Sequence, residues 1–159
     1  MEKGCGTIKR LGLKRTELYL GIDIVEFATL ALNFARSLSG GEIVLFFGDL
    51  GTGKTTFIRK MSESLGVVPE HVRSPTFTIA NSYRGSELEI YHIDVYRISG
   101  EELIDLGFYD YCHERSVVFV EWGEKIVDLV DGIDYIVELS IQEENLEKRN
   151  ISIYSGTGD

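Results

Sequence analysis

The 159-residue sequence has no long apolar stretch and only two cysteines. Its longest apolar run is the five residues from Ile43 to Phe47, whereas about 20 are needed to span a bilayer. The N-terminal residues also lack the apolar core of a signal peptide. Cys5 and Cys112 lie far apart and form no C-x-x-C pair, so the sequence predicts neither a disulfide framework nor a zinc site. We therefore expect a soluble, cytoplasmic protein that does not bind a membrane.

Positive charge is also scarce: 16 lysines and arginines stand against 26 aspartates and glutamates, which gives a formal net charge of -10. Non-specific affinity for nucleic acid comes from lysine and arginine at phosphates, so any role with nucleic acid is expected to be indirect. We interpret residues 1–15 as a basic N-terminal tail and residues 16–159 as a single domain, a size that suits one buried core. The basic residues of the tail are Lys3, Lys9, Arg10, Lys14 and Arg15.

The strongest motif is a glycine-rich loop of the form G-x-x-x-x-G-K-T, which follows the apolar residues 43–47 and precedes a helix predicted over 55–65. In such a loop, glycines let backbone N–H groups converge on an anion, and the helix N-terminus adds positive potential. Lys54 is expected to reach the β- and γ-phosphates, and the Thr55 hydroxyl to bind Mg²⁺. The expected ligand is a nucleoside triphosphate with magnesium. The predicted binding residues are Gly48, Asp49, Leu50, Gly51, Thr52, Gly53, Lys54, Thr55 and Thr56.

Two acidic residues end predicted strands further along the chain. Glu121 follows the apolar residues 117–120 and is the candidate magnesium carboxylate, either as a direct ligand or through water. Asp94 ends a strand predicted over 88–94, where its carboxylate could orient the attacking water or hold a magnesium-bound water. Two interpretations stay open for its neighbours. Arg97 either offsets charge near the γ-phosphate or pairs with Asp94, and His92 is either functional or a core histidine.

Thr76 completes the predicted catalytic set, which also contains Lys54, Asp94 and Glu121. Held by the preceding Pro75, it resembles a switch threonine that contacts the γ-phosphate or magnesium only while both are bound. A simple turn at this position is the alternative.

The remaining pattern predicts the α/β class, with a P-loop NTPase fold in which helices flank a mixed, mainly parallel sheet that includes an antiparallel hairpin. Asp23 and Glu26 have capping-box spacing for a helix that runs to about Ser37. Other helical segments are predicted at residues 55–65, 69–72, 100–106 and 123–130. Strands are predicted at residues 17–20, 43–47, 77–83, 88–94, 117–120, 135–141 and 150–154.

Three other functions share the phosphate loop. A small-molecule kinase has comparable length and magnesium chemistry, but it usually carries an arginine-bearing lid, and the arginines after the loop are scattered. A regulatory GTPase is disfavoured because the sequence has no N-K-x-D and no D-x-x-G motif, which favours adenine as the base. A structural subunit that binds nucleotide without hydrolysing it is the third alternative.

Four segments, GDLGTGKTT, SPTF, YHIDVYR and VVFVEW, occur in this order along the chain. Together they resemble the TsaE (YjeE-like) family of small bacterial ATPases, over roughly Thr16 to Trp122. The resemblance implies a phosphate-loop fold and the role of ATPase subunit in the cytoplasmic machinery that makes threonylcarbamoyladenosine in tRNA. It also implies two partners, the TsaD transferase and its inactive paralogue TsaB, through which the protein would meet tRNA only indirectly.

Residue by residue, the resemblance places the phosphate loop at 48–56, the magnesium ligands at Thr55 and Glu121, the switch at 74–76 and the catalytic carboxylate at Asp94. The family loop commonly has alanine where this chain has Thr52, a change that does not threaten phosphate binding. The implied role of ATP hydrolysis is to reset the TsaB–TsaD complex between tRNA cycles.

Overall fold

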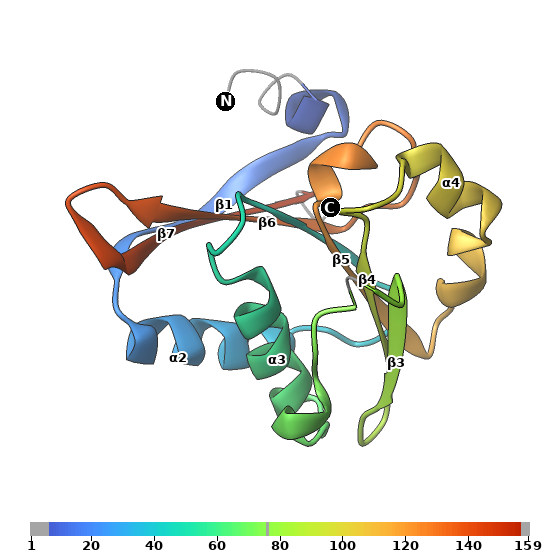
Figure 1. The fold of residues 1–159 in the computed structure, drawn as a ribbon, viewed down its shortest axis with the longest axis horizontal. Helices are drawn as coiled ribbons and strands as arrows, with labels where there is room; N and C mark the ends of the chain where they lie inside the picture. The colour runs from blue at the N-terminus through green and yellow to red at the C-terminus, as the bar shows by residue number, and fades with distance from the viewer. Residues whose placement is uncertain (1–6, 76, 157–159) are drawn as a thin grey trace.

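In a computed structural model that describes residues 7–75 and 77–156, a seven-stranded sheet forms the centre of the molecule (Figure 1). Across the sheet the strand order is β1-β7-β6-β2-β5-β4-β3. The adjacent strands β6, β2, β5 and β4 are parallel, and antiparallel strands complete both edges. The strands are β1 (Leu13–Ile22), β2 (Ile43–Phe47), β3 (Ala80–Arg84), β4 (Glu89–Asp94), β5 (Ser116–Glu121), β6 (Tyr135–Gln142) and β7 (Asn145–Gly156).

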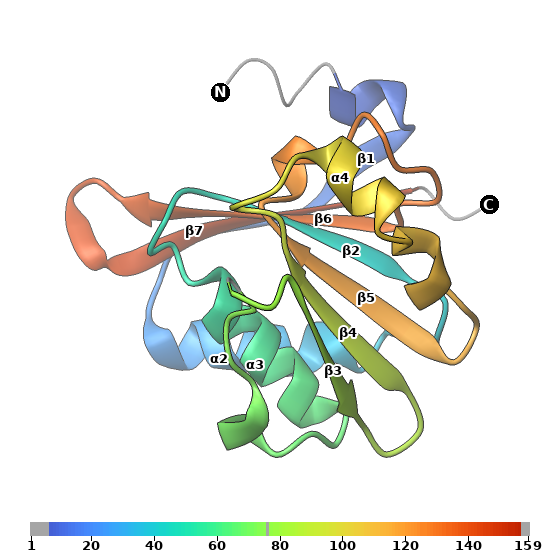
Figure 2. The same cartoon turned by 45° about the vertical axis from the view of Figure 1, so that its right-hand side comes forward.

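Helices cover both faces of the sheet (Figure 2). Helices α2 and α3 lie together on one face, and α4 lies on the other with the short turns that follow it. The helices are α2 (Ile24–Ala35), α3 (Lys54–Ser64) and α4 (Gly100–Asp105), and the 3₁₀ turns are η1 (Pro69–His71), η2 (Phe108–Tyr111) and η3 (Gly123–Lys125). This arrangement confirms the predicted α/β phosphate-loop fold and its antiparallel β3–β4 hairpin. Within the described part of the chain, no helix has the length and apolar character needed to cross a membrane.

The capping box predicted at the start of α2 is confirmed. The Asp23 carboxylate accepts hydrogen bonds from the N–H groups of Val25 (3.0 Å) and Glu26 (2.9 Å). In return, the Glu26 carboxylate accepts one from the Asp23 N–H (2.8 Å). These bonds satisfy N–H groups that have no partner inside the helix. The helix ends at Ala35, slightly before the predicted limit.

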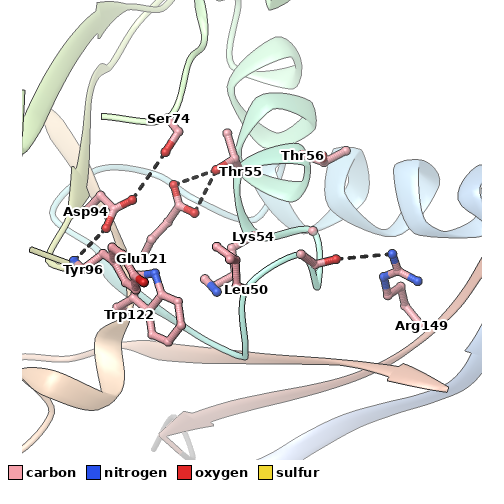
Figure 3. A pocket seen from close by; sticks show the side chains of 12 residues that line it. Leu50, Lys54, Thr55, Thr56, Ser74, Asp94, Tyr96, Glu121, Trp122 and Arg149 are labelled. Carbon is pink, nitrogen blue, oxygen red and sulfur yellow. Dashed lines mark hydrogen bonds between the residues drawn. The ribbon is translucent and has the colours of Figure 1, made fainter. Parts of the chain in front are cut away.

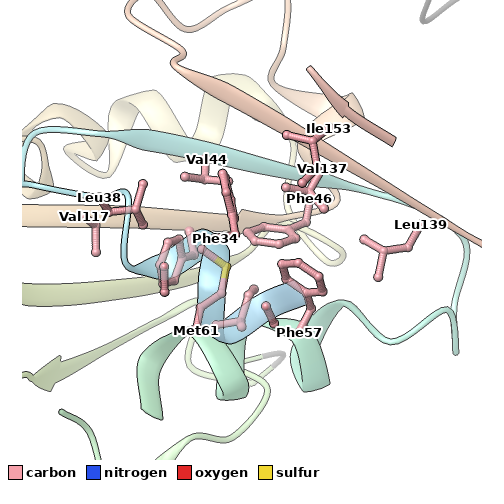
Figure 4. Close-up of a cluster of buried hydrophobic side chains, with 14 of the residues drawn as sticks. Phe34, Leu38, Val44, Phe46, Phe57, Met61, Val117, Val137, Leu139 and Ile153 are labelled. Carbon is pink, nitrogen blue, oxygen red and sulfur yellow. The ribbon is translucent and has the colours of Figure 1, made fainter. Parts of the chain in front are cut away.

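The sheet separates two apolar cores, and β2 contributes to both. Val44 and Phe46 face the core under α2 and α3, which Figure 4 shows. Ile43, Leu45 and Phe47 face the core on the α4 side. A central parallel strand is covered on both faces, which explains why its sequence is continuously apolar rather than alternating. The buried position of β2 fixes the phosphate loop that follows it.

The first strand is longer than predicted. It runs from Leu13 rather than Glu17, so the predicted boundary between tail and domain at residue 15 falls inside β1. Ile8, from the helical residues 7–10, is also buried in the core on the α4 side. The basic residues of this segment led to its interpretation as a tail, but Ile8 and Leu13 between them are buried and anchor it to the core.

Two other segments differ from the sequence prediction. The strand predicted from residue 77 begins only at Ala80, since residues 77–79 form a turn and the Ile79 N–H donates to the Pro75 carbonyl (2.7 Å). The helix predicted at 123–130 shortens to η3, followed by turns. There Lys125 Nζ donates to three carbonyls of the neighbouring loop at residues 95, 96 and 98.

Candidate functional site

The glycine-rich loop connects the carboxyl end of β2 to the start of α3, and its backbone needs glycine. Gly48, Gly51 and Gly53 have φ angles of 145°, 80° and 105°, values that side chains disfavour. A Cβ on Gly48 would also lie 2.5 Å from the carbonyl oxygen of Leu139. The loop therefore holds a shape that other residues would strain, as the motif predicted.

A pocket of about 360 Å³ opens between this loop and the ends of β4 and β5 (Figure 3). It brings the predicted carboxylates, Asp94 and Glu121, to the side facing the loop. The predicted loop residues that line it are Leu50, Gly51, Gly53, Lys54, Thr55 and Thr56. The remaining predicted loop residues brace the loop from behind: the Thr52 hydroxyl donates to the Asp49 carbonyl (2.9 Å), and the Gly48 N–H donates to the Glu124 carboxylate (3.4 Å).

Lys54 is held inside the loop. Its ammonium donates to the carbonyls of Gly48 (2.6 Å) and Asp49 (3.0 Å) and lies 4.1 Å from the centre of the Trp122 ring. Burial lowers the pKa of this ammonium, and the negative charges of Glu121 and its acidic neighbours oppose that shift. The side chain is thus a nearly buried cation at the base of the glycine-rich loop, a position suited to an anionic ligand.

Thr55 and Glu121 meet directly. The Thr55 hydroxyl lies 2.8 and 2.9 Å from the two carboxylate oxygens, and Glu121 is only 4% exposed. A hydroxyl and a carboxylate at one point are hard oxygen ligands of the kind Mg²⁺ prefers, so the pair fits the predicted metal site. In the described part of the chain no group of three or more His, Cys, Asp or Glu is arranged to hold a metal. A magnesium site of this type needs fewer protein ligands, because phosphate oxygens and water supply the rest.

Asp94 lies beside Glu121, because the parallel strands β4 and β5 end in register at these two residues. Its carboxylate accepts hydrogen bonds from the Tyr96 N–H (2.8 Å) and the Ser74 hydroxyl (3.4 Å). The second contact connects Asp94 to the predicted switch segment at residues 74–76. Thr76 itself lies outside the described residues. The Asp94 carboxylate remains at the pocket wall, 5% exposed, where it could hold water.

The two open interpretations of the neighbouring side chains are now clearer. His92 is fully buried, and its Nε2 lies 2.6 Å from a carboxylate oxygen of Glu121, so it is a core histidine that also contacts the site. The Arg97 guanidinium lies 4.5 Å over the centre of the Phe77 ring, and Phe77 is 84% exposed. Arg97 is thus on the outer surface of the loop after β4.

Three residues around the pocket were not predicted as site residues. Arg149, on β7, donates through Nε to the Thr52 carbonyl (2.9 Å) and so supports the back of the phosphate loop. Trp122 lines the pocket with a left-handed backbone (φ 61°), and its ring packs 5.1 Å from that of Tyr96. Glu124 accepts from Gly48, and burial raises the pKa of its carboxyl group. For Trp122 and Glu124, the sequence signal was their position in the segment VEWGEK, which also contains Glu121.

The chain is similar to known proteins of one family. Residues 23–151 match the family model for threonylcarbamoyl adenosine biosynthesis protein TsaE. Over 126 residues the chain is 37% identical to tRNA threonylcarbamoyladenosine biosynthesis protein TsaE of Aquifex aeolicus. The aligned region covers 79% of this chain and 86% of that protein. Over 99 residues it is 43% identical to the Bacillus subtilis protein of the same name, covering 62% of this chain and 60% of that protein.

Among solved structures, the chain is similar to the crystal structure of YdiB from Bacillus subtilis. The TM-score is 0.67 at 27% sequence identity, and the match covers 91% of this chain and 88% of that one. The match to the family model spans the glycine-rich loop, both acidic residues of the pocket and Arg149 on β7. The chain belongs to the TsaE family.

Proposed function

We propose that the protein is a magnesium-dependent ATPase that serves the threonylcarbamoyladenosine modification of tRNA. One observation carries the enzymatic part: Lys54, Thr55 and Glu121 converge on one pocket at the mouth of a glycine-rich loop, with Asp94 beside them. The biological part rests on family membership, because the relatives are named for tRNA threonylcarbamoyladenosine biosynthesis.

The chain's own residues suggest how hydrolysis would proceed. The loop N–H groups and Lys54 bind the phosphates, and Lys54 exchanges its bonds to the loop carbonyls for bonds to phosphate oxygens. Thr55 and Glu121 would hold Mg²⁺, which when bound neutralises charge on the phosphate oxygens. Asp94 orients a water for attack on the γ-phosphate, since phosphoryl transfer depends mainly on positioning and charge compensation.

Replacing Glu121 by alanine tests the magnesium part of the proposal. We expect turnover to fall by about 100-fold or more, since metal-ion stabilisation of the transition state is worth several kcal/mol. Nucleotide binding should also lose most of its dependence on Mg²⁺, measured by calorimetry over a magnesium series. The control is Glu101→Ala, which removes an exposed carboxylate from α4. Identical magnesium titrations for Glu121→Ala and the unaltered protein would remove Glu121 from the metal site.

The proposed partners are TsaD and TsaB, with ATP hydrolysis resetting their complex between tRNA cycles. A net charge of -10 fits a subunit that docks on proteins and leaves RNA to others. We expect slow hydrolysis by the protein alone and a clear rise when both partners are added, measured as phosphate release. A rate that the partners leave unchanged, together with fast transfer of phosphate to a metabolite, would instead identify a small-molecule kinase.

A further inference from the structure

His92 lies in the middle of the hairpin that ends at the candidate site. On β4 it stands opposite Asn81 of β3, and its side chain is 0% exposed. Its Nε2 is 2.6 Å from Oε2 of Glu121, an oxygen that also lies 2.9 Å from the Thr55 hydroxyl. A carboxylate only accepts hydrogen bonds, so Nε2 carries the hydrogen in this contact. His92 is therefore a donor to the carboxylate proposed to hold magnesium.

The other ring nitrogen of His92 faces Tyr83. The Tyr83 hydroxyl lies 3.4 Å from Nδ1 of His92 and 3.2 Å from the carbonyl oxygen of Arg73. The same hydroxyl oxygen accepts from the Arg73 N–H (3.3 Å) and the Asn81 amide (3.4 Å). A phenol has a single hydrogen, so it can be donated to the histidine or to the Arg73 carbonyl but not to both at once. Tyr83 thus connects the histidine to the main chain of Arg73.

These contacts form a continuous path, Glu121–His92–Tyr83–Arg73, which we call the hairpin relay. It starts at the candidate magnesium carboxylate and ends one residue before Ser74, whose hydroxyl contacts Asp94. The relay and the Asp94 contact therefore reach adjacent residues of the same loop, Arg73 and Ser74. If position 92 served only to fill the core, an apolar residue would suffice. The buried Glu121 carboxylate, however, needs a hydrogen-bond donor to compensate for its lost hydration, and His92 supplies one.

We propose that His92 is a positioning residue for Glu121. Through Nε2–H it holds the carboxylate in the orientation in which both oxygens meet Thr55, and Tyr83 fixes the histidine ring and couples it to Arg73. The inference rests on the proposed function, because it assigns a task to a residue behind the candidate metal ligand. Groups that orient metal ligands typically change metal affinity or activity by about 10- to 100-fold when they are removed.

Two substitutions of His92 separate positioning from simple packing. In His92→Asn the side-chain amide lies near the former position of Nδ1, and the side chain is too short to reach Glu121. In His92→Gln the longer chain can bring an N–H donor to the place of Nε2. We expect His92→Asn to raise the Mg²⁺ concentration at half-saturation of ATP-analogue binding by about 10- to 100-fold. Affinity measured in excess EDTA should be unchanged, and His92→Gln should return the magnesium titration close to that of the unaltered protein.

Tyr83→Phe tests the outer half of the relay, because it removes the hydroxyl and keeps the ring. We expect a smaller rise in the magnesium requirement than for His92→Asn. The double variant should be no worse than His92→Asn alone, since Tyr83 acts through the histidine. Tyr91→Phe is the matched control: this tyrosine is on the neighbouring strand, and its hydroxyl donates to Glu89 (2.9 Å), away from the site.

Calorimetry with a non-hydrolysable ATP analogue and thermal melting of each variant decide the outcome. A His92→Asn titration equal to that of the unaltered protein would overturn the inference, as would a His92→Gln variant impaired as strongly as His92→Asn. If His92→Asn does not fold, identical titrations for Tyr83→Phe and Tyr91→Phe would overturn it. If the unaltered protein shows no magnesium-dependent nucleotide binding, the proposed function itself fails and the inference falls with it.

Discussion

Replacing Lys54 by alanine is expected to abolish most ATP hydrolysis, with kcat lower by about 10²- to 10³-fold, the loss seen when one preorganised donor to developing charge is removed. The side chain is 5% exposed and already donates to the carbonyls of Gly48 and Asp49, so the ammonium is held where phosphates would enter. Low exposure strengthens its attraction for a polyanion, because water screens it little. ATP affinity should fall as well, which equilibrium binding would show.

Lys60→Ala provides the control for this experiment. Lys60 is on the same helix, but it lies in a partly exposed ion pair with Glu63 (3.1 Å), a contact that contributes little to stability. We expect its hydrolysis and nucleotide affinity to match those of the unaltered protein. If Lys54→Ala hydrolysed ATP at the normal rate, the assignment of residues 48–56 as a phosphate loop would be wrong.

Replacing Phe57 by alanine is expected to lower the free energy of unfolding strongly. Phe57 is fully buried on the inner face of α3, where its ring packs edge-on against Phe27 (5.3 Å between centroids) and near Phe46 (5.9 Å). Truncation of a buried phenylalanine typically costs about 3–5 kcal/mol, from lost burial and from the cavity that remains. For a domain of this size that corresponds to a fall in Tm of roughly 6 to 20 °C.

Chemical and thermal denaturation measure this effect directly. Phe77→Ala is the control, because Phe77 is 84% exposed and its ring lies under the Arg97 guanidinium at the surface. Its stability should change by no more than about 0.5 kcal/mol, the usual range for surface substitutions. An equal loss for both variants would mean that α3 does not pack on the sheet as described.

Much of the fold and the centre of the site follow from local sequence. The apolar run of β2, the glycines after it and the capping box of α2 each satisfy a short-range rule, and the structure confirms all three. The positions of Asp94 and Glu121 at strand ends also follow, and the structure brings the two together because β4 and β5 are parallel neighbours, an adjacency that local sequence does not specify.

Contacts between distant segments could not be predicted in this way. Arg149 supports Thr52 only because β7 reaches β1 and β6 in one particular register. Nothing in the sequence near Arg149 specifies that register, so it was noted only as one of several scattered arginines. The same holds for Tyr83 and His92, whose hydroxyl and ring meet across a hairpin predicted without a register. The segment 123–130 looked helical, but the bonds of Lys125 to another loop decided its conformation.

The place of β2 in the sheet has a consequence for biosynthesis. Both of its neighbours, β5 and β6, come much later in the chain, at Ser116–Glu121 and Tyr135–Gln142. Sheets built from such distant partners fold slowly, because long stretches of chain must be ordered before their contacts are made. On the ribosome, residues 43–47 would lack both flanking strands until residues 116–142 had emerged. The pocket at the mouth of the glycine-rich loop would therefore be complete only after β5 had been made, so a ligand bound there could not guide the earliest steps of folding.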